Sequence, residues 1–469
     1  MLMQWIQPRR LRGFFLLLLC GFQLNGFAYP AASGGATSVR KQDVNAFSLP
    51  SANMSFERKV DFSVGNSFFR NPWVMAPSST TARDGLGPLF NTNGCQNCHI
   101  KDGRGHLPGE HDQNVVSMLV RISVAPQNGE QRLLQQRQGV LPDPVYGTQI
   151  QDFAIPGLQP EARIVIDYEY RGIMLADGEI VQLRKPVVTL AQPGYGPFSA
   201  QLQTSLRLAP PMIGLGLLEA IPVATLLSFA DETDQNQDGV SGRVNRVWSE
   251  ETGDFAIGRF GWKAEQPSLR QQNAAAFAGD IGITTHLVAQ TDCTVRQTDC
   301  MNAPNGGAPE ASDRILDLVT FYSRNLAVPV RRNTKDTQVV EGETLFAQAG
   351  CESCHRTHIK TALLADQPEQ SEQLIHPYTD LLLHDMGAGL DDNRPVFLAS
   401  GSEWRTPPLW GIGLTATVSG SEHYLHDGRA RTLLEAILWH GGEAAASQRK
   451  VVAMSKQERE ALLAFLRSL

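Results

Sequence analysis

The sequence has no excess of positive charge. Its 469 residues include 41 Lys and Arg against 48 Asp and Glu, so the formal net charge at pH 7 is −7. The first 28 residues, which we expect to be removed, contain three arginines and no acidic residue, so the remaining chain carries −7 − 3 = −10. This balance argues against nucleic acid and anionic membranes as partners.

Long apolar segments are also absent after the N-terminus, so no membrane span is predicted. The N-terminus itself has the three parts of an export signal: arginines within 9–12, an apolar run at 14–20 and small residues at 26–28. One alternative is a membrane anchor, for which the run is too short. Another is lipidation at Cys20, but the preceding Leu19 is bulky. We predict a signal peptide over 1–28 and a periplasmic location.

Cysteine is scarce, and four of the seven cysteines form two copies of one pattern. Residues 95–99 read Cys-Gln-Asn-Cys-His and residues 351–355 read Cys-Glu-Ser-Cys-His, each preceded by a Leu-Phe pair and a glycine. The C-x-x-C-H pattern attaches a c-type haem, because both thiols bond to the porphyrin and the histidine ligates the iron. We therefore predict two covalently bound haem c groups, held by Cys95, Cys98 and His99 and by Cys351, Cys354 and His355.

Apart from Cys20, the two remaining cysteines are Cys293 and Cys300, which flank a short polar loop. An even number of unused cysteines in an exported protein favours a disulfide, so we predict that these two are bonded to each other. Two free buried thiols are the alternative.

The pattern of apolar residues predicts a mainly α fold with two cytochrome-c-like haem domains, at 45–335 and 336–469. Helical periodicity occurs at 217–229, 269–278, 314–325, 432–440 and 456–469. Between about 115 and 190 the pattern alternates instead, and the runs 163–170 and 179–190 around an Ala-Asp-Gly turn predict a β-hairpin. We expect this stretch to be a β-rich insertion that enlarges the first domain.

A second repeat supports duplication of one ancestral haem domain. Residues 210–217 read Pro-Pro-Met-Ile-Gly-Leu-Gly-Leu and residues 407–414 read Pro-Pro-Leu-Trp-Gly-Ile-Gly-Leu. Each segment follows the C-x-x-C-H copy of its own half.

One polar segment resembles a calcium loop. Asp234, Asn236 and Asp238, followed by Gly239, supply the oxygen ligands and the central glycine of such a loop. The twelfth position, usually a bidentate glutamate, is Asn245 here. Calcium in an irregular loop and a solvated Asp/Asn turn therefore both remain open.

Longer motifs carry a family resemblance. Residues 424–436 (Tyr-Leu-His-Asp-Gly-Arg-Ala-Arg-Thr-Leu-Leu-Glu-Ala) resemble the C-terminal signature of bacterial di-haem cytochrome c peroxidases and MauG-type enzymes. The segments 377–387, 404–413 and 436–444 look like the di-haem oxidoreductase family, whose members are described as peroxidases and also as thiol oxidoreductases. The resemblance covers about 65–469, and its motifs are long and specific.

The resemblance implies a sixth ligand for the iron of the second haem. In the peroxidases this ligand lies eight positions after the threonine of a T-L-x-x-A helix, which leads here from Thr432 to His440. Those enzymes carry methionine there, so a histidine implies a bis-His haem of lower potential. A His440 that caps a helix before Gly441 is the alternative, and Met386 is the rival ligand.

The first half resembles the same enzymes in three spaced residues. Those enzymes have a tryptophan between the haems, a glutamine ten residues later and then an acid in the peroxide pocket. This sequence has Trp262, Gln272 and Asp280. Asp280 lies two positions from the place where the spacing in those enzymes would put the acid, and it is Asp where they have Glu. Each residue alone could be structural, as a core Trp, a surface Gln and a helix-capping Asp.

Other residues of the first half leave its chemistry open. Glu219 is a second candidate acid, although it lies in an apolar run where it could end a helix. His106 and His111 follow the first C-x-x-C-H copy and could ligate its iron, but loop histidines are often exposed. We leave the sixth position of the first iron open.

These implications predict a peroxidase. The C-terminal haem would accept electrons from a redox partner protein, Trp262 would relay them, and the N-terminal haem would reduce hydrogen peroxide with help from Asp280 and Gln272. The alternatives are a non-catalytic electron carrier with two six-coordinate irons, and a MauG-like or thiol oxidase that acts on a partner protein.

Overall fold

The structure is a computed structural model that describes residues 31–109 and 114–469. The predicted signal peptide, Cys20 and His111 lie outside these ranges. Within the described ranges no helix is both long and apolar enough to cross a membrane.

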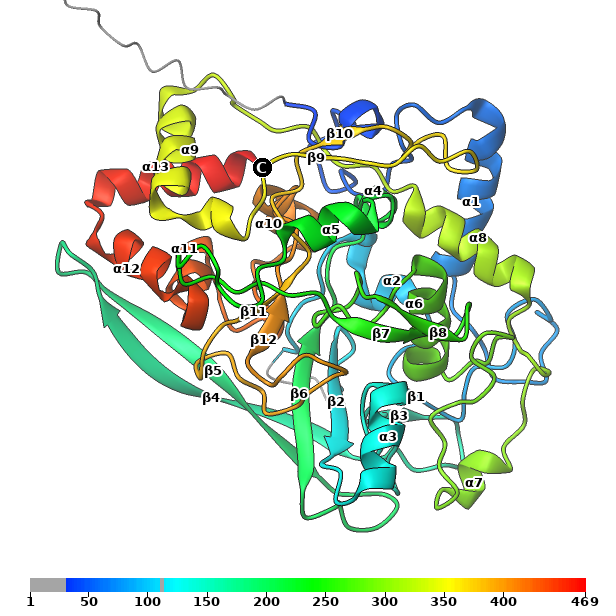
Figure 1. The fold of residues 1–469 in the computed structure, drawn as a ribbon. Helices are drawn as coiled ribbons and strands as arrows, with labels where there is room; N and C mark the ends of the chain where they lie inside the picture. Colours follow the sequence, from blue (N-terminus) through cyan, green and yellow to red (C-terminus); the bar gives the residue numbers. More distant parts are fainter. Residues whose placement is uncertain (1–30, 110–113) are drawn as a thin grey trace, which may run out of the picture.

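Helices occur along the whole described chain (Figure 1). Those with eight or more residues are α1 (Phe56–Arg70), α3 (Gly129–Gln138), α6 (Leu269–Ala276), α8 (Asp313–Arg324), α9 (Thr337–Ala349), α12 (Ala445–Ala453) and α13 (Lys456–Ser468). The shorter α-helices are α2 (Cys95–Cys98), α4 (Leu215–Glu219), α5 (Val223–Phe229), α7 (Thr298–Met301), α10 (Thr415–Ser419) and α11 (Leu433–Leu438). The remaining helical turns are η1 (Gly35–Thr37), η2 (Ile100–Asp102), the π-helical η3 (Phe277–Ile281), η4 (Cys351–Ser353), η5 (Ile412–Leu414) and η6 (Gly442–Ala444).

The strands of the described residues form six antiparallel pairs. They are β1 (Leu89–Phe90) with β3 (Phe153–Ala154), β2 (Met118–Val124) with β6 (Leu202–Leu208), β4 (Arg163–Met174) with β5 (Ile180–Ala191), β7 (Arg246–Ser249) with β8 (Asp254–Ile257), β9 (Ile359–Lys360) with β10 (Leu374–Ile375), and β11 (Leu383–Asp385) with β12 (Glu403–Arg405).

The prediction of a mainly α fold is wrong, because the chain is 30% helix and 17% strand with several small sheets. Three of the strand pairs contain only two or three residues per strand, too few for alternation to be visible in the sequence. The pairing of β2 with β6 joins segments far apart in the chain, which no local pattern predicts. This architecture does not establish two cytochrome-c-like domains, and the boundaries at 45–335 and 336–469 stay predictions.

The predicted hairpin is confirmed as β4 and β5, which pair from Arg163↔Ala191 to Met174↔Ile180. In Figure 1 it runs along the side of the molecule beneath α11 and α12. Leu175 and Leu183 are buried in the same apolar cluster as Val451 of α12. The predicted insertion therefore packs against the C-terminal half.

Each half contains one close helix crossing built on a glycine. A Cβ on Gly65 of α1 would lie 2.2 Å from Leu318 O of α8, and a Cβ on Gly342 of α9 would lie 1.9 Å from Ala461 O of α13. Only glycine allows the backbones to approach this closely. Aromatic side chains pack beside the crossings, namely Phe62, Phe69 and Tyr322 in the first half and Phe346 and Phe465 in the second.

Two of the predicted helices are interrupted. The helix expected over 217–229 is divided into α4 and α5, because Pro222 has no N–H to continue the helical bonds. The helix expected over 269–278 ends as α6 at Ala276, and the chain continues as the π-helical turn η3. The helices predicted near 314–325, 432–440 and 456–469 are confirmed as α8, α11 and α13.

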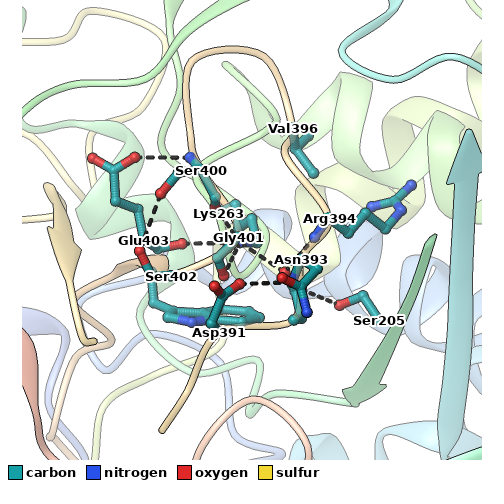
Figure 2. Close-up of polar contacts among 12 residues, drawn as sticks. Ser205, Lys263, Asp391, Asn393, Arg394, Val396, Ser400, Gly401, Ser402 and Glu403 are labelled. Carbon is teal, nitrogen blue, oxygen red and sulfur yellow. Dashed lines mark hydrogen bonds and ion pairs between the residues drawn. The ribbon is translucent and has the colours of Figure 1, made fainter. Parts of the chain in front are cut away.

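Lys263 holds an irregular loop between β11 and β12 (Figure 2). Its Nζ donates to the carbonyls of Ser400, Gly401 and Glu403 at 2.6, 2.9 and 3.2 Å and lies 3.3 Å from Asp392 Oδ1. The side chain is 0% exposed. Burial lowers the pKa of Lys263 to about 8, opposed by Asp392, so the ammonium group stays largely charged at pH 7.

Replacing this ammonium group should destabilise the fold. Lys263→Met would leave three carbonyls and a carboxylate buried without their donor, and we expect the free energy of unfolding to fall by about 3–5 kcal/mol. Urea denaturation followed by circular dichroism measures the change. Lys360→Met is the matched control: Lys360 pairs with Glu372 at 3.4 Å on the surface, where a loss below about 1 kcal/mol is expected. Equal losses in the two variants would contradict the role of Lys263.

Candidate functional site

The two C-x-x-C-H copies form matching helical turns. The first is α2 followed by His99, and the second begins with η4 and ends at His355. In both, the backbone N–H of the histidine donates to the carbonyl of the first cysteine, His99 to Cys95 and His355 to Cys351, at 3.0 Å. None of the four thiols forms a disulfide. Each turn therefore places two free thiols and one imidazole together.

Distant backbone carbonyls orient both histidine rings. His99 Nδ1 donates to Pro210 O at 2.7 Å, and His355 Nδ1 donates to Tyr378 O at 2.8 Å. Each bond places the ring proton on Nδ1 and leaves Nε2 free to ligate a metal. Burial lowers the pKa of His355 to about 4 and also lowers the pKa of His99. Both rings are therefore neutral at pH 7, as metal ligation requires.

Both turns face one internal cavity of about 660 Å³. The candidate residues Trp262, Gln272, Asp280 and His440 line the same cavity. Residues that lie far apart in the sequence therefore meet in one space, and the predicted site is a single region of the fold.

Three buried arginines on the cavity wall have N–H groups without partners. Nε of Arg104, Nε and Nη1 of Arg207 and Nε of Arg394 make no hydrogen bond to the described residues. A guanidinium group that loses its hydration without gaining an acceptor is costly. Haem carries two propionate carboxylates, and arginine binds carboxylates strongly. The thiols, the neutral imidazoles and these unpaired N–H groups therefore fit haem as the resident group.

His440 follows α11 and lies on the wall beside the second turn. Its Nδ1 donates to Ala436 O at 2.8 Å, so Nε2 is free in the same way as in His99 and His355. Burial lowers the pKa of His440, which keeps this ring neutral as well. Met386 also lines the cavity, so both candidate sixth ligands face the same space as the second turn.

The chain after His440 packs against the end of β11. A Cβ on Gly442 would lie 2.1 Å from Asp385 O, so the contact requires glycine at this position. Glu443 accepts hydrogen bonds from Ser241 N, Ser241 Oγ, His384 Nδ1 and Asp385 N. The two family motifs at 377–387 and 436–444 therefore form one structural unit that fixes the backbone near His440.

His384 is buried between two carboxylates. Its Nε2 lies 2.9 Å from Asp380, and its Nδ1 lies 2.7 Å from Glu443 and 3.5 Å from Cys354 Sγ. Burial opposes the charge, but hydrogen bonds to the carboxylates raise the pKa of His384 well above its usual value. Cys354, Asp380 and His384 are the one metal-like group of His, Cys, Asp or Glu in the part of the chain that the structure describes. Because Cys354 is a predicted haem thioether, we assign no separate metal there.

Trp262 is buried where the two halves meet. Its Nε1 donates to Leu208 O at 3.0 Å, and its ring lies in an apolar cluster with Leu409 and Leu433 of the C-terminal half. The guanidinium carbon of Arg104 lies 5.4 Å from the ring centroid. An aromatic ring in this place can shorten the electron path between the two turns.

Gln272 and Asp280 reach the cavity from consecutive elements, Gln272 from α6 and Asp280 from η3. The backbone Asp280 O accepts the N–H groups of Asn91 and Thr92, a few residues before the first turn, and Asp280 lines the same cavity as Cys95. Burial and the Asp280 carboxylate raise the pKa of the Cys95 thiol to about 12. The structure thus brings the predicted acid to the first C-x-x-C-H turn.

The predicted calcium ligands do not line the cavity. Asp234, Asn236 and Asp238 occupy a largely exposed loop, where the Asp234 carboxylate accepts the N–H groups of Asp238 and Gly239. Among the described residues this loop does not bring three His, Cys, Asp or Glu ligand atoms together. Calcium binding stays a prediction.

Three other sequence candidates have structural partners. Cys293 and Cys300 are joined by a disulfide, with their Cα atoms 5.9 Å apart. Glu219 accepts hydrogen bonds from Leu269 N at 2.8 Å and Arg324 Nε at 2.7 Å, which anchors the start of α6. His106 Nδ1 lies 3.3 Å from Ser117 Oγ.

Several cavity residues were missed by sequence reasoning. The ring of His426 stacks on Trp404 with centroids 3.6 Å apart, and burial lowers the pKa of His426 to about 3. Its position inside the 424–436 motif could have drawn attention to it. No local signal distinguishes the three unpaired arginines from surface arginines, because their burial depends on contacts distant in sequence.

Comparison with known protein families identifies the family of this chain. A family model described as "Di-haem oxidoreductase, putative peroxidase" matches residues 27–469, which include both C-x-x-C-H turns and His440. A search of curated proteins finds no match.

The ligand of the second iron can be tested directly in the haem-loaded protein. Replacement of His440 by alanine should convert one low-spin ferric signal to high spin, because the iron loses a strong-field sixth ligand. Absorption and EPR spectra of the oxidised protein measure this. Met386→Leu is the control, since Met386 lines the same wall, and its spectrum should match that of the wild type. A high-spin signal in Met386→Leu, with no change when His440 is replaced, would assign the sixth ligand to Met386.

Proposed function

Because the chain belongs to the di-haem oxidoreductase family, we propose that it is a periplasmic c-type enzyme that reduces hydrogen peroxide with electrons from a redox partner protein. The observation that carries the proposal is the shared cavity, which is lined by both C-x-x-C-H turns together with Trp262, Asp280 and His440. A non-catalytic carrier needs two haems, but it does not need an acid beside one of them.

When bound, the haems supply the irons that store electrons and reduce peroxide. The protein's own contribution begins with His99 and His355, whose Nδ1–H bonds to backbone carbonyls hold both rings in the ligating orientation. The apolar walls and the buried Trp262 exclude water from the space between the two turns.

The reduction of hydrogen peroxide consumes two electrons and two protons and forms two water molecules. We assign the proton transfer to Asp280, whose carboxylate takes a proton from one peroxide oxygen and returns it to the other, which leaves as water. The Gln272 amide, on the same wall, can donate a hydrogen bond that orients the peroxide.

The two haems have different roles in this proposal. His440, together with His355, would hold the second haem, which would serve electron transfer, and Asp280 would lie beside the first haem, which would supply the peroxide chemistry. Trp262 would relay electrons from the C-terminal half, where the partner protein would deliver them, to the N-terminal half. Cys293 and Cys300 are bonded to each other, so neither is a free thiol for an internal thiol oxidation.

Spectra and turnover of the haem-loaded protein test this division. We expect one high-spin and one low-spin ferric haem in the EPR spectrum, and consumption of hydrogen peroxide in the presence of a reduced c-type cytochrome. Asp280→Asn should lower kcat/KM for peroxide by about 100-fold or more, because the proton acceptor is lost. Two low-spin haems that do not react with peroxide would overturn the proposal and favour an electron carrier.

A further inference from the structure

The Asp280 side chain is held on one of its two oxygens. Oδ1 accepts a hydrogen bond from Gln149 Nε2 at 3.0 Å and lies 3.9 Å from Arg121 Nη2. Oδ2 accepts no hydrogen bond from the residues that the structure describes, and the side chain is 23% exposed. One oxygen is therefore fixed, and the other is free for a proton.

Gln149 contacts two residues of the η3 turn, Gly279 and Asp280. It is 0% exposed, and its Nε2 lies 3.0 Å from Gly279 O and 2.5 Å from Asn91 Oδ1. The backbone N–H of Asn91 donates to Asp280 O, so Asn91 holds the backbone of Asp280 and Gln149 holds its side chain. A fully buried amide with this many acceptors has little freedom to rotate.

Arg121 and Gln149 reach Asp280 as neighbours on paired backbone. Arg121 is part of β2 and forms an antiparallel bridge with Gln149, flanked by the hydrogen bonds Ile122 N to Thr148 O and Ile150 N to Val120 O. The register of this pairing places the side chains of Arg121 and Gln149 beside the Asp280 carboxylate. At 3.9 Å the guanidinium group is beyond direct hydrogen-bond distance, so Asp280 has a cation nearby but is not bonded to it.

We propose that Gln149 is a positioning residue that keeps the Asp280 carboxylate directed into the cavity and out of a two-point hydrogen-bonded contact with Arg121. The inference rests on the proposed peroxide reaction and deepens it. A two-point bond to a guanidinium group would engage both carboxylate oxygens and weaken Asp280 as a proton acceptor. The neutral amide of Gln149 occupies Oδ1 alone and leaves Oδ2 free.

Cyanide binding to the haem-loaded, oxidised protein gives a readout separate from turnover. Hydrogen cyanide must give its proton to an acceptor before cyanide ligates an open iron, and the association rate is followed by the absorption change. Gln149→Leu should slow this association, and lower kcat/KM for peroxide, by about tenfold or more, since it removes the bond that directs the acceptor. Gln149→Glu, which keeps the side-chain size but removes the donor, should act in the same direction.

Gln151→Leu is the matched control. Gln151 Nε2 donates to the same carbonyl, Gly279 O, at 2.7 Å, but Gln151 makes no contact with the Asp280 side chain among its hydrogen bonds in the structure. Gln151→Leu should change the rate of cyanide association by less than about twofold, because the Asp280 carboxylate stays directed into the cavity. The second control is the Asp280→Asn background, in which Gln149→Leu should cause no further loss if Gln149 acts only through Asp280.

The outcomes distinguish the positioning role of Gln149 from the proposed peroxide reaction. Equal losses in Gln149→Leu and Gln151→Leu, or a further loss in the Asp280→Asn background, would overturn the positioning role while leaving the peroxide reaction intact. If the wild-type protein binds no cyanide and does not react with peroxide, it has no open iron. Both the proposed function and this inference would then be overturned.

Discussion

Two hydrogen bonds from imidazole Nδ1 atoms to backbone carbonyls orient the rings of His99 and His355, and the rest of the site depends on this orientation. The C-x-x-C-H turns are too short to hold a ring in one direction by themselves. His99 relies on Pro210, which is 111 residues away, and His355 relies on Tyr378. Pro210 lies just after β6, and β6 is placed by its pairing with β2. The β2–β6 pairing therefore has a direct function, because it places the carbonyl that orients the first histidine.

The cavity that results combines apolar walls with buried cations. Arg104, Arg207 and Arg394 have N–H groups that find no acceptor among the described residues. Such groups stabilise a folded protein only when an anion joins them, since burial removes their hydration. Covalently attached haem would bring carboxylates into this space. Folding and haem binding would therefore be coupled, and the haem would complete a part of the core.

Local chemistry was predictable from the sequence, and spatial relations were not. The β4–β5 hairpin and the helix at 456–468 depend on short patterns of residue type, and they form as expected. The mainly α prediction failed because strands of two or three residues leave no pattern. The roles of Gln149 and Lys263 were invisible for a different reason, because both act through contacts between segments far apart in the chain.

The surroundings of the two turns explain how similar motifs can serve different purposes. Beside the second turn, His384 bonds to Asp380 and Glu443, and Glu443 fixes the chain after His440. Beside the first turn, Asp280 keeps one oxygen free of hydrogen bonds and lies 3.9 Å from the Arg121 guanidinium group, beyond hydrogen-bond distance. A proton acceptor must be fixed in place and yet not neutralised, whereas an electron-transfer site needs rigidity alone. The two sets of partners fit these separate requirements, so the proposed functional difference would arise from the neighbouring residues and not from the C-x-x-C-H turns.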